Sequence, residues 1–351
     1  MKTYEGIQRN ETIFLGIDLH KTTWYVTART KDQELFTKGI PGKWWVLEHL
    51  LDCFSGCRIK AVYEAGYFGY WLHDKLNSVG VECIVTPPSL IPQQYGNKVK
   101  TDRRDSHKLA LLFSKGLLKG VYVPSRQELS HRQVLRRRTQ LIQNRVRTQN
   151  RIKAELRFYG IEAPTPQGRW SKSYIQMLGD IQFDNNWCQQ NFKRLLEEFE
   201  FLTCQIEKQT QLLKEMSKMP IYKNRVAILT SIPGVGTLTA LEILLELHNM
   251  ERFRRSEQIA AYVGLTPAQY SSGDKVRMGR ITGIGKSHLR ATLVEASWQL
   301  IRRDESMRKI YERIKHGSGA KRAIVGIARR LLLIARKMLI ENQVYKRPQA
   351  A

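Results

Sequence analysis

Two aspartates stand three positions apart in the stretch KTDRRDSHKLALLF, residues 100–113, where an apolar helical pattern begins. Residues i and i+3 share one face of a helix, so Asp102 and Asp105 can point at one site. Their carboxylate oxygens are hard ligands of the kind that Mg²⁺ prefers. A plainer interpretation is also open, because Asp102 suits the N-cap of this helix and an acid three residues later suits the helix dipole.

Two further acids come at the ends of predicted strands. Asp18 ends the run TIFLGID, residues 12–18, and Glu64 follows a strand predicted over residues 59–63. Hydrolysis or transfer at a phosphodiester requires an activated nucleophile and a stabilised leaving oxygen, and two Mg²⁺ ions about 3.5–4 Å apart supply both. Each acid alone is an ordinary feature of a folded chain. The combination predicts a metal-dependent catalytic site made of Asp18, Glu64, Asp102 and Asp105.

The elements that must position these acids follow a recognisable order. Strands are predicted at residues 12–18, 22–30, 34–38, 59–63 and 81–86, and helices near 44–51, 71–76 and 102–118. Three meandering strands followed by helix–strand alternation match an α/β ribonuclease H-like fold. The first and fourth strands are neighbours in that fold, so Asp18 and Glu64 would meet the start of the helix that carries the other two acids.

The composition indicates a polyanionic partner. Among 351 residues, 58 are Lys or Arg and 32 are Asp or Glu, which gives a formal net charge of +26 and a pI of about 10.0. Nucleic acid is the partner that this surplus favours, because neutralised phosphates release counterions. An anionic membrane surface is the weaker alternative, and no apolar run approaches the roughly 20 residues that span a bilayer.

The N-terminus and the cysteines bear on the compartment. The first residues lack the positive-then-apolar pattern of a signal peptide. Five cysteines are too few and too scattered for a disulfide scaffold, and Cys53 and Cys57 have no second pair at zinc-site spacing. We therefore expect reduced thiols in a cytoplasmic protein without a membrane partner.

A long helix is predicted over residues 131–157, with apolar residues at roughly heptad spacing and nine cations against one acid. The stretch APTPQGRW, residues 163–170, interrupts the pattern before a second long helix with a similar stripe. The pair fits an antiparallel coiled-coil arm, although two core helices of a bundle fit equally well. The excess of arginine favours nucleic-acid contact through Arg136, Arg137, Arg138, Arg145, Arg147 and Arg151.

Two glycine-rich turns precede helices later in the chain. SIPGVG, residues 231–236, resembles a helix-hairpin-helix element, whose backbone N–H groups bind phosphate at a helix N-terminus, but an ordinary turn between two helices is the alternative. GIGK, residues 283–286, repeats the theme, and the spacings of Walker-type and GxGxxG nucleotide sites are absent. We expect nucleic-acid contacts at Gly234, Gly236, Lys286 and Arg290.

Between these turns, Ser271 and Ser272 precede Gly273. A serine hydroxyl is a poor nucleophile unless it is activated, and neighbouring cations can stabilise an attacked phosphate. By residue type alone, this SSG stretch is a turn. The cations that follow it, and that we expect to contact nucleic acid, are Lys275, Arg277 and Arg280.

Several of these motifs together resemble one family. They are FLGIDLHK around Asp18, VYEAG at Glu64, KTDRRD at 100–105, SIPGVG at 231–236 and YVGLTPAQYSSGDKVRMGRITGIGKSHLR at 262–290. This ordered set resembles the DEDD-type insertion-sequence transposases of the IS110 group, including its IS1111 branch, which are also called bridge-RNA-guided recombinases. The resemblance extends from about residue 12 to about residue 335. One departure is EAGYFGYW after Glu64, where many members have a threonine–glycine pair after the alanine.

The resemblance implies an organisation and a mechanism. Residues 1–125 would form a RuvC-like nuclease domain whose Asp18, Glu64, Asp102 and Asp105 bind Mg²⁺, residues 126–218 a basic coiled-coil arm, and residues 219–351 a mainly α transposase domain. Ser272 aligns with the serine that attacks DNA and forms a phosphoserine link, although the assignment could slip to Ser271.

The resemblance also implies partners. Dimers assemble into tetramers, and a structured noncoding guide RNA from the element pairs with donor and target DNA while the protein recognises RNA shape and backbone. The implied setting is the bacterial cytoplasm, in association with the nucleoid. The function expected is therefore RNA-guided transposition of the protein's own element.

Two other functions remain open on the residues alone. A junction-resolving nuclease would use the four carboxylates with water as nucleophile and leave Ser272 as a turn residue. A non-catalytic nucleic-acid-binding protein would use only the basic helix and the glycine turns. The order of the acids along one fold argues against the second.

Overall fold

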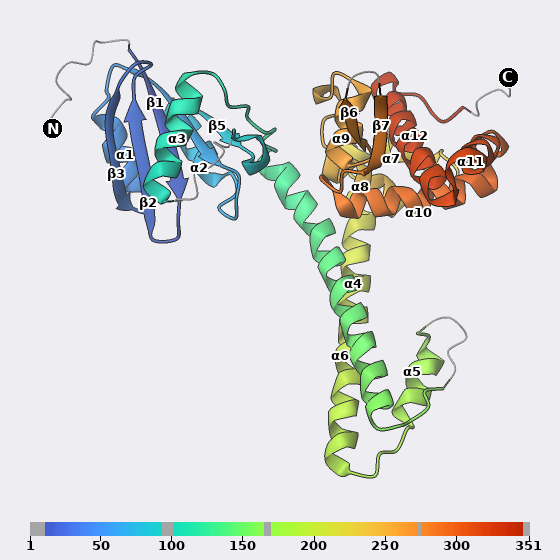
Figure 1. Ribbon diagram of the computed structural model, residues 1–351. Coiled ribbons are helices and arrows are strands. Elements are labelled where there is room, and N and C mark those ends of the chain that lie inside the picture. The colour runs from blue at the N-terminus through green and yellow to red at the C-terminus, as the bar shows by residue number, and fades with distance from the viewer. Residues whose placement is uncertain (1–10, 93–100, 165–169, 273–274, 347–351) are drawn as a thin grey trace. The chain divides into compact units, whose positions relative to one another are not determined.

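The computed structural model describes residues 11–92, 101–164, 170–272 and 275–346, and for Ser271, Ser272, Lys275 and Val276 it describes the backbone alone. The chain divides into two compact units, Met1–Val123 and Pro124–Ala351 (Figure 1). Each unit encloses a large hydrophobic core of its own.

A mixed five-stranded sheet with the order β3-β2-β1-β4-β5 forms the first unit. Its strands are β1 (Thr12–Leu19), β2 (Thr23–Arg29), β3 (Glu34–Pro41), β4 (Arg58–Glu64) and β5 (Glu82–Thr86). β1 pairs antiparallel with β2 and parallel with β4. The prediction that the first and fourth strands are neighbours is therefore confirmed, and the mixed α/β order is consistent with a ribonuclease H-like fold.

Helices cover the two faces of this sheet. They are α1 (Trp44–Asp52), α2 (Trp71–Ser78) and α3 (Asp102–Ser114), with a 3₁₀ turn η1 (Pro88–Leu90). Successive strand residues point to opposite faces, and on β1 the fully buried Ile13, Leu15 and Ile17 pack in one core with residues of α1 and α2. The intervening residues of β1 face α3, which lies across the sheet in Figure 1.

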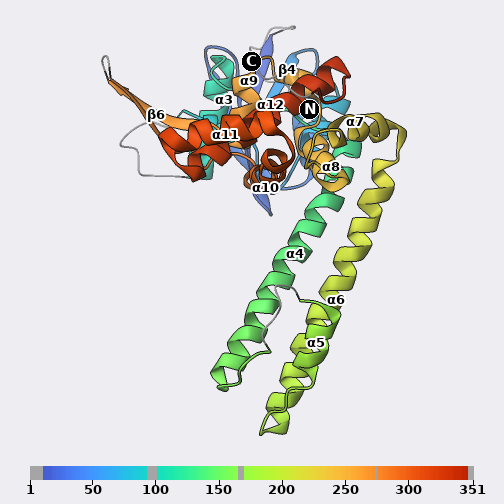
Figure 2. The same ribbon diagram turned by 90° about the vertical axis from the view of Figure 1, so that its right-hand side faces the viewer.

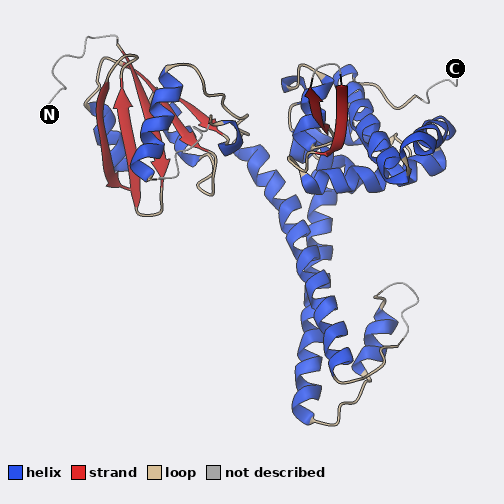
Figure 3. Cartoon of the chain, in the orientation of Figure 1, coloured by secondary structure: helices blue, strands red, loops and turns tan. Residues whose placement is uncertain are grey.

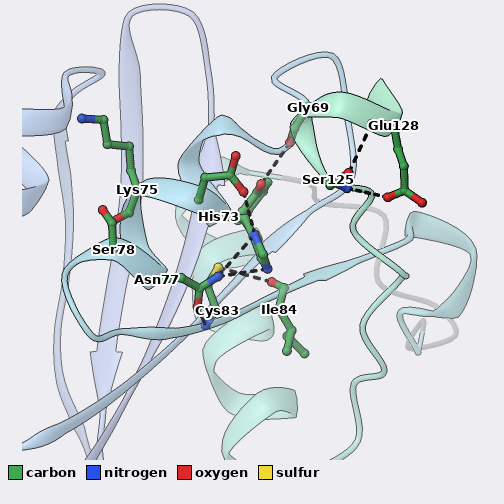
Figure 4. A network of polar contacts seen from close by, with 11 residues as sticks. Gly69, His73, Lys75, Asn77, Ser78, Cys83, Ile84, Ser125 and Glu128 are labelled. Carbon is green, nitrogen blue, oxygen red and sulfur yellow. Dashed lines mark hydrogen bonds and ion pairs between the residues drawn. The ribbon is translucent and has the colours of Figure 1, made fainter. Parts of the chain in front are cut away.

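Polar contacts hold α2 and the loop before it against the sheet (Figure 4). The Asn77 side-chain oxygen accepts a hydrogen bond of 3.3 Å from the Cys83 backbone N–H on β5, and its amide nitrogen lies 3.1 Å from Nε2 of His73. The Tyr63 hydroxyl donates to the Gly69 carbonyl at 3.0 Å. Tyr63, the residue before Glu64, thus anchors the loop that follows Glu64.

Two long helices dominate the first part of the second unit. α4 (Arg126–Phe158) begins with a capping box at Ser125 and Glu128, α5 (Lys172–Gly179) follows, and α6 (Asn186–Ser217) runs back along α4 (Figure 2). Two hydrogen bonds show that the helices pair antiparallel, because residues later in α4 contact residues earlier in α6. Arg138 Nε donates to Thr210 Oγ1 at 2.8 Å, and Thr148 Oγ1 donates to Glu198 Oε1 at 3.0 Å. Buried apolar side chains line the seam between them.

The remainder of the second unit is mainly helical (Figure 3). Its helices are α7 (Pro220–Thr230), α8 (Thr237–Leu247), η2 (Met250–Arg252), α9 (Ser256–Val263), α10 (Ser287–Arg303), α11 (Glu305–Ser318) and α12 (Ala320–Glu341), and its strands are β6 (Pro267–Ser272) and β7 (Lys275–Ile281). Every residue of α8 from Ala240 to Leu247 is buried. This helix is therefore the centre of the core.

Several local predictions were wrong. Thr101, not Asp102, is the N-cap of α3, and it makes no side-chain cap bond. The helix ends at Ser114 rather than near Leu118, because Gly116 adopts a φ of 69°. Gly319 alone separates the last two helices, since α11 continues to Ser318 and α12 begins at Ala320.

Neither the hairpin β6–β7 nor the short helix α5 was predicted. In the part of the chain that the structure describes, no helix combines the length and apolar character needed to cross a membrane.

Candidate active site

The carboxylates of Asp18 and Glu64 come from adjacent parallel strands. Ile17 of β1 pairs with Tyr63 of β4, so the next residue on each strand lies at the same edge of the sheet. Alternation along the strands places both acids on the face of Gly16 and Val62, which is the face that α3 covers. The sheet therefore presents two acids toward the start of α3, where Asp102 and Asp105 stand.

Gly16 is what allows α3 to come so close. A Cβ at this position would overlap the Ser106 carbonyl oxygen and the Ala110 amide nitrogen of α3. The motif FLGID thus combines an apolar strand, a glycine on which the helix rests and the acid that ends the strand. This contact brings the first turn of α3 to the end of β1.

His20 lies between two of the predicted carboxylates. Its Nε2 is 3.0 Å from Asp18 Oδ2 and 3.4 Å from Asp102 Oδ1. One ligand atom from each of the three residues lies within 4.8 Å of the others. Sequence reasoning missed His20, although its position two residues after Asp18 in IDLHK places it on the same side of an extended chain.

The electrostatics of Asp18 show crowding of negative charge. Burial raises the pKa of this carboxyl group, the hydrogen bond from His20 opposes the rise, and the charges of Asp105 and Asp102 add to it. The charge of Asp105 therefore reaches the carboxyl group of Asp18. Crowded carboxylates of this kind are relieved by a cation.

The donor set fits a hard divalent cation. Carboxylate oxygens are the ligands that Mg²⁺ prefers, and a few suffice because the ion retains several waters. Asp18 and Asp102 stand within reach of one position, and Asp105 and Glu64 lie on the helix turn and strand end that border it. An imidazole beside carboxylates is also a common arrangement around bound metals.

The serine stretch lies on the hairpin of the second unit. Ser272 of β6 pairs with Lys275 of β7 in the antiparallel ladder, whereas Gly273 lies outside the described residues. Arg277 and Arg280 of β7 are exposed. The two serines thus lie at the end of the β6–β7 ladder that is opposite to the pair Pro267 and Ile281.

The two glycine turns pack tightly against neighbouring backbone. At Gly234, with a φ of 91°, a Cβ would lie 2.6 Å from Gln299 Cβ on α10. At Gly285, with a φ of 97°, it would lie 2.9 Å from the Gly264 amide nitrogen. Packing therefore accounts for these two glycines, while Gly236 is the N-cap of α8.

Two glutamates of α8 are buried, and one of them, Glu246, engages two cations that were predicted to contact nucleic acid. Glu246 accepts two bonds from Arg136, at 3.0 and 3.3 Å, and lies 3.3 Å from Lys286 Nζ. Glu242 lies 2.5 Å from His288 Nδ1. Sequence reasoning missed this layer, because acids on an apolar helix show their burial only once the helix is packed.

The other predicted cations differ in their surroundings. Arg290 donates to the Val263 carbonyl at 3.0 Å, and Arg151 lies 3.6 Å from Glu198. Arg138 and Arg145 are partly buried on α4. The predicted cations of that helix that are exposed are Arg136, Arg137, Arg147 and Arg151, and Arg147 lies 3.5 Å from Asn144 Oδ1.

Comparisons with known proteins identify similar chains. Residues 226–312 match the family described as "Transposase IS116/IS110/IS902 family", and residues 15–161 match a DEDD model of the IS110 group described as "Transposase". These ranges contain the four carboxylates, the glycine turns and the serine stretch.

Individual relatives extend the similarity. A protein of Sinorhizobium fredii named as a transposase is 30% identical over 236 residues, which cover 67% of this chain and 57% of that protein. The transposase for insertion sequence element IS1533 of Leptospira borgpetersenii is 26% identical over 82% of this chain and 85% of its own length. The transposase for insertion sequence element IS1111A of Coxiella burnetii is 25% identical over 95% of this chain and 91% of its own.

Proposed function

Because the chain belongs to the IS116/IS110/IS902 family of transposases, whose members cleave DNA and transfer its strands, we propose that it is an RNA-guided recombinase that excises and inserts its own mobile element. The observation that carries the catalytic part is the meeting of Asp18 with Asp102 and His20 at the end of β1, beside the strand end that bears Glu64. The chain would consist of a nuclease domain at 1–125, an arm at 126–218 and a transposase domain at 219–351.

The four carboxylates would hold Mg²⁺. When bound there, two ions would stabilise the charge on the scissile phosphate and on the leaving oxygen. Asp18 and Glu64 would be fixed by their strands, and Asp102 and Asp105 by the contact of α3 with Gly16. His20 would orient Asp18 and Asp102 through its Nε2 atom.

Ser272 would be the nucleophile, as the resemblance of the SSG stretch implies. Its oxygen would form a bond to phosphorus as the bond from phosphorus to the leaving sugar oxygen breaks. The serine proton is lost and the leaving oxygen takes up a proton. Because the phosphoserine ester keeps one phosphodiester bond for each one broken, strand exchange would proceed without ATP.

A guide RNA and further subunits complete the proposal. The formal net charge of +26 supports a large polyanionic partner, and exposed arginines such as Arg137 and Arg147 on α4 would contact it. The protein would act as a dimer or tetramer, with carboxylates of one subunit completing a site around the serine of another.

The test is to trap the covalent intermediate on DNA that carries the element ends. The wild-type protein should yield a protein–DNA adduct that survives denaturation, whereas Ser272→Ala should yield none. Ser271→Ala is the matched control and should keep the adduct. Cleavage by Ser272→Ala with a water-derived phosphate end would overturn the serine step and favour hydrolysis by the carboxylates alone.

A further inference from the structure

A groove with a volume of about 730 Å³ lies between the β6–β7 hairpin and the start of α12. Cationic side chains from both elements border it, namely Arg280 of β7 and Lys321, Arg322 and Arg329 of α12. Its floor includes the apolar side chains of Met278 and Val325. None of these α12 residues was singled out by the sequence motifs.

The cations of α12 stand where the helix itself disfavours them. Lys321 and Arg322 are exposed in the first turn, and that turn contains no acid. Positive charge near a helix N-terminus opposes the helix dipole, whereas an anion is favoured there. Among the residues that the structure describes, neither side chain takes part in an ion pair. Their placement therefore lowers the stability of α12 unless an anion binds.

The apolar floor distinguishes this groove from a purely phosphate-binding surface. Both apolar side chains of the floor are accessible to a ligand, because Met278 is 59% exposed and Val325 is only partly buried. Single-stranded nucleic acid binds in grooves where cations contact the phosphate backbone and other side chains contact the bases. Unpaired bases leave their flat faces free for such contacts. In a duplex these faces are stacked against one another.

The position of the groove relates it to the serine stretch. The hairpin ladder runs from Pro267 paired with Ile281, beside the groove, to Ser272 paired with Lys275. Five residues of strand span about 17 Å at about 3.3 Å each. At about 3.4 Å per nucleotide, a strand covers that length in roughly five nucleotides.

We propose that this groove binds an unpaired segment of the substrate DNA strand, roughly five nucleotides from the bond that the serine attacks. Phosphates lie on Lys321, Arg322 and Arg280, and bases lie on Met278 and Val325. The inference rests on the proposed function for the bond that is attacked, while the binding of single-stranded DNA stands on the groove itself.

The experiment measures binding of the full-length protein to fluorescent oligothymidine of about 20 nucleotides, longer than one such site, over a range of salt concentrations. The Lys321→Gln/Arg322→Gln double variant should lower the slope of log affinity against log salt by about 1.4, because each neutralised phosphate of a single strand contributes about 0.7. The double variant should unfold at the same temperature as wild type or higher, since it removes two charges that oppose the helix dipole.

The matched control is Arg313→Gln/Arg330→Gln, which removes two exposed charges from α11 and α12 outside the groove and should leave the slope unchanged. An equal loss in both double variants would overturn the groove as a site. A loss confined to oligouridine RNA would assign it to RNA and overturn the DNA assignment. Failure of the wild-type protein to bind any DNA would overturn the proposed function as well, which separates the two results.

The floor is tested separately with Met278→Ser against Val344→Ser, a comparably exposed apolar residue outside the groove. Met278→Ser should weaken binding of oligothymidine several-fold and leave binding of an abasic strand of equal length unchanged. Equal effects on the two strands, or equal effects of the two variants, would contradict contact between the floor and the bases.

Discussion

Gly16 of β1 lies against Ala110 of α3 so closely that a Cβ on Gly16 would overlap the Ala110 amide nitrogen. This contact sets the distance between the sheet and the helix that carries Asp102 and Asp105. The acids at the end of β1 and at the start of α3 therefore depend on a residue that has no side chain.

Gly16→Ala should destabilise the first unit by about 1–3 kcal/mol, the usual cost of overpacking a core, and should lower strand cleavage by displacing α3. Chemical denaturation and a cleavage assay measure the two effects. Gly39→Ala on β3 is the control, because its Cβ would meet the Tyr25 ring at an ordinary 3.4 Å. Equal stability of the two variants would contradict the close packing.

Mg²⁺ should raise the unfolding temperature of the wild-type protein, because an ion that binds only the folded state stabilises it by about 2.7 kcal/mol at a hundred times its Kd. Asp18→Asn should abolish this rise. In the absence of metal the same variant should be at least as stable as wild type, since burial and the neighbouring Asp105 and Asp102 already raise the pKa of Asp18. Asp32→Asn, in the exposed turn after β2, should retain the full response; if it did not, the ion would bind elsewhere.

His20→Gln should reduce cleavage by about 10–100-fold, the usual effect of losing a group that orients metal ligands. Asp102→Ala should reduce it further. The concentration of Mg²⁺ needed for half-maximal activity separates the roles, and it should rise in His20→Gln because Asp18 and Asp102 lose the atom between them. His49→Gln on α1 is a control that leaves the site untouched, and an unchanged Mg²⁺ requirement in His20→Gln would contradict an orienting role.

The pair His288 and Glu242 should make stability depend on pH. The hydrogen bond to Glu242 raises the pKa of His288, against the opposing effect of burial. A histidine with a raised folded-state pKa contributes stability that is complete below its unfolded pKa of about 6.5 and is lost as pH rises through the folded value. The difference in unfolding temperature between wild type and His288→Gln should therefore shrink as pH rises above about 6.5. His316→Gln, at an exposed position of α11, should show no such trend.

The sequence by itself determined the order of strands, the neighbouring positions of the first and fourth, and the family. Three kinds of pattern are local and can be recognised along the chain. They are the alternation of buried residues in strands, the glycines that precede helices, and the DEDD acids. The arrangement of Asp18 and Glu64 followed because paired strands end at the same edge of the sheet.

Only the tertiary structure brought His20 between Asp18 and Asp102, buried Glu242 and Glu246 beneath the cations of α4 and α10, and placed Lys321 and Arg322 across a groove from Met278. These relationships join residues far apart in the chain through helix packing. The physical reason is that burial and the distance between charges depend on which faces of different helices and strands pack together. A sequence pattern predicts the apolar face of each element separately but not its packing partner.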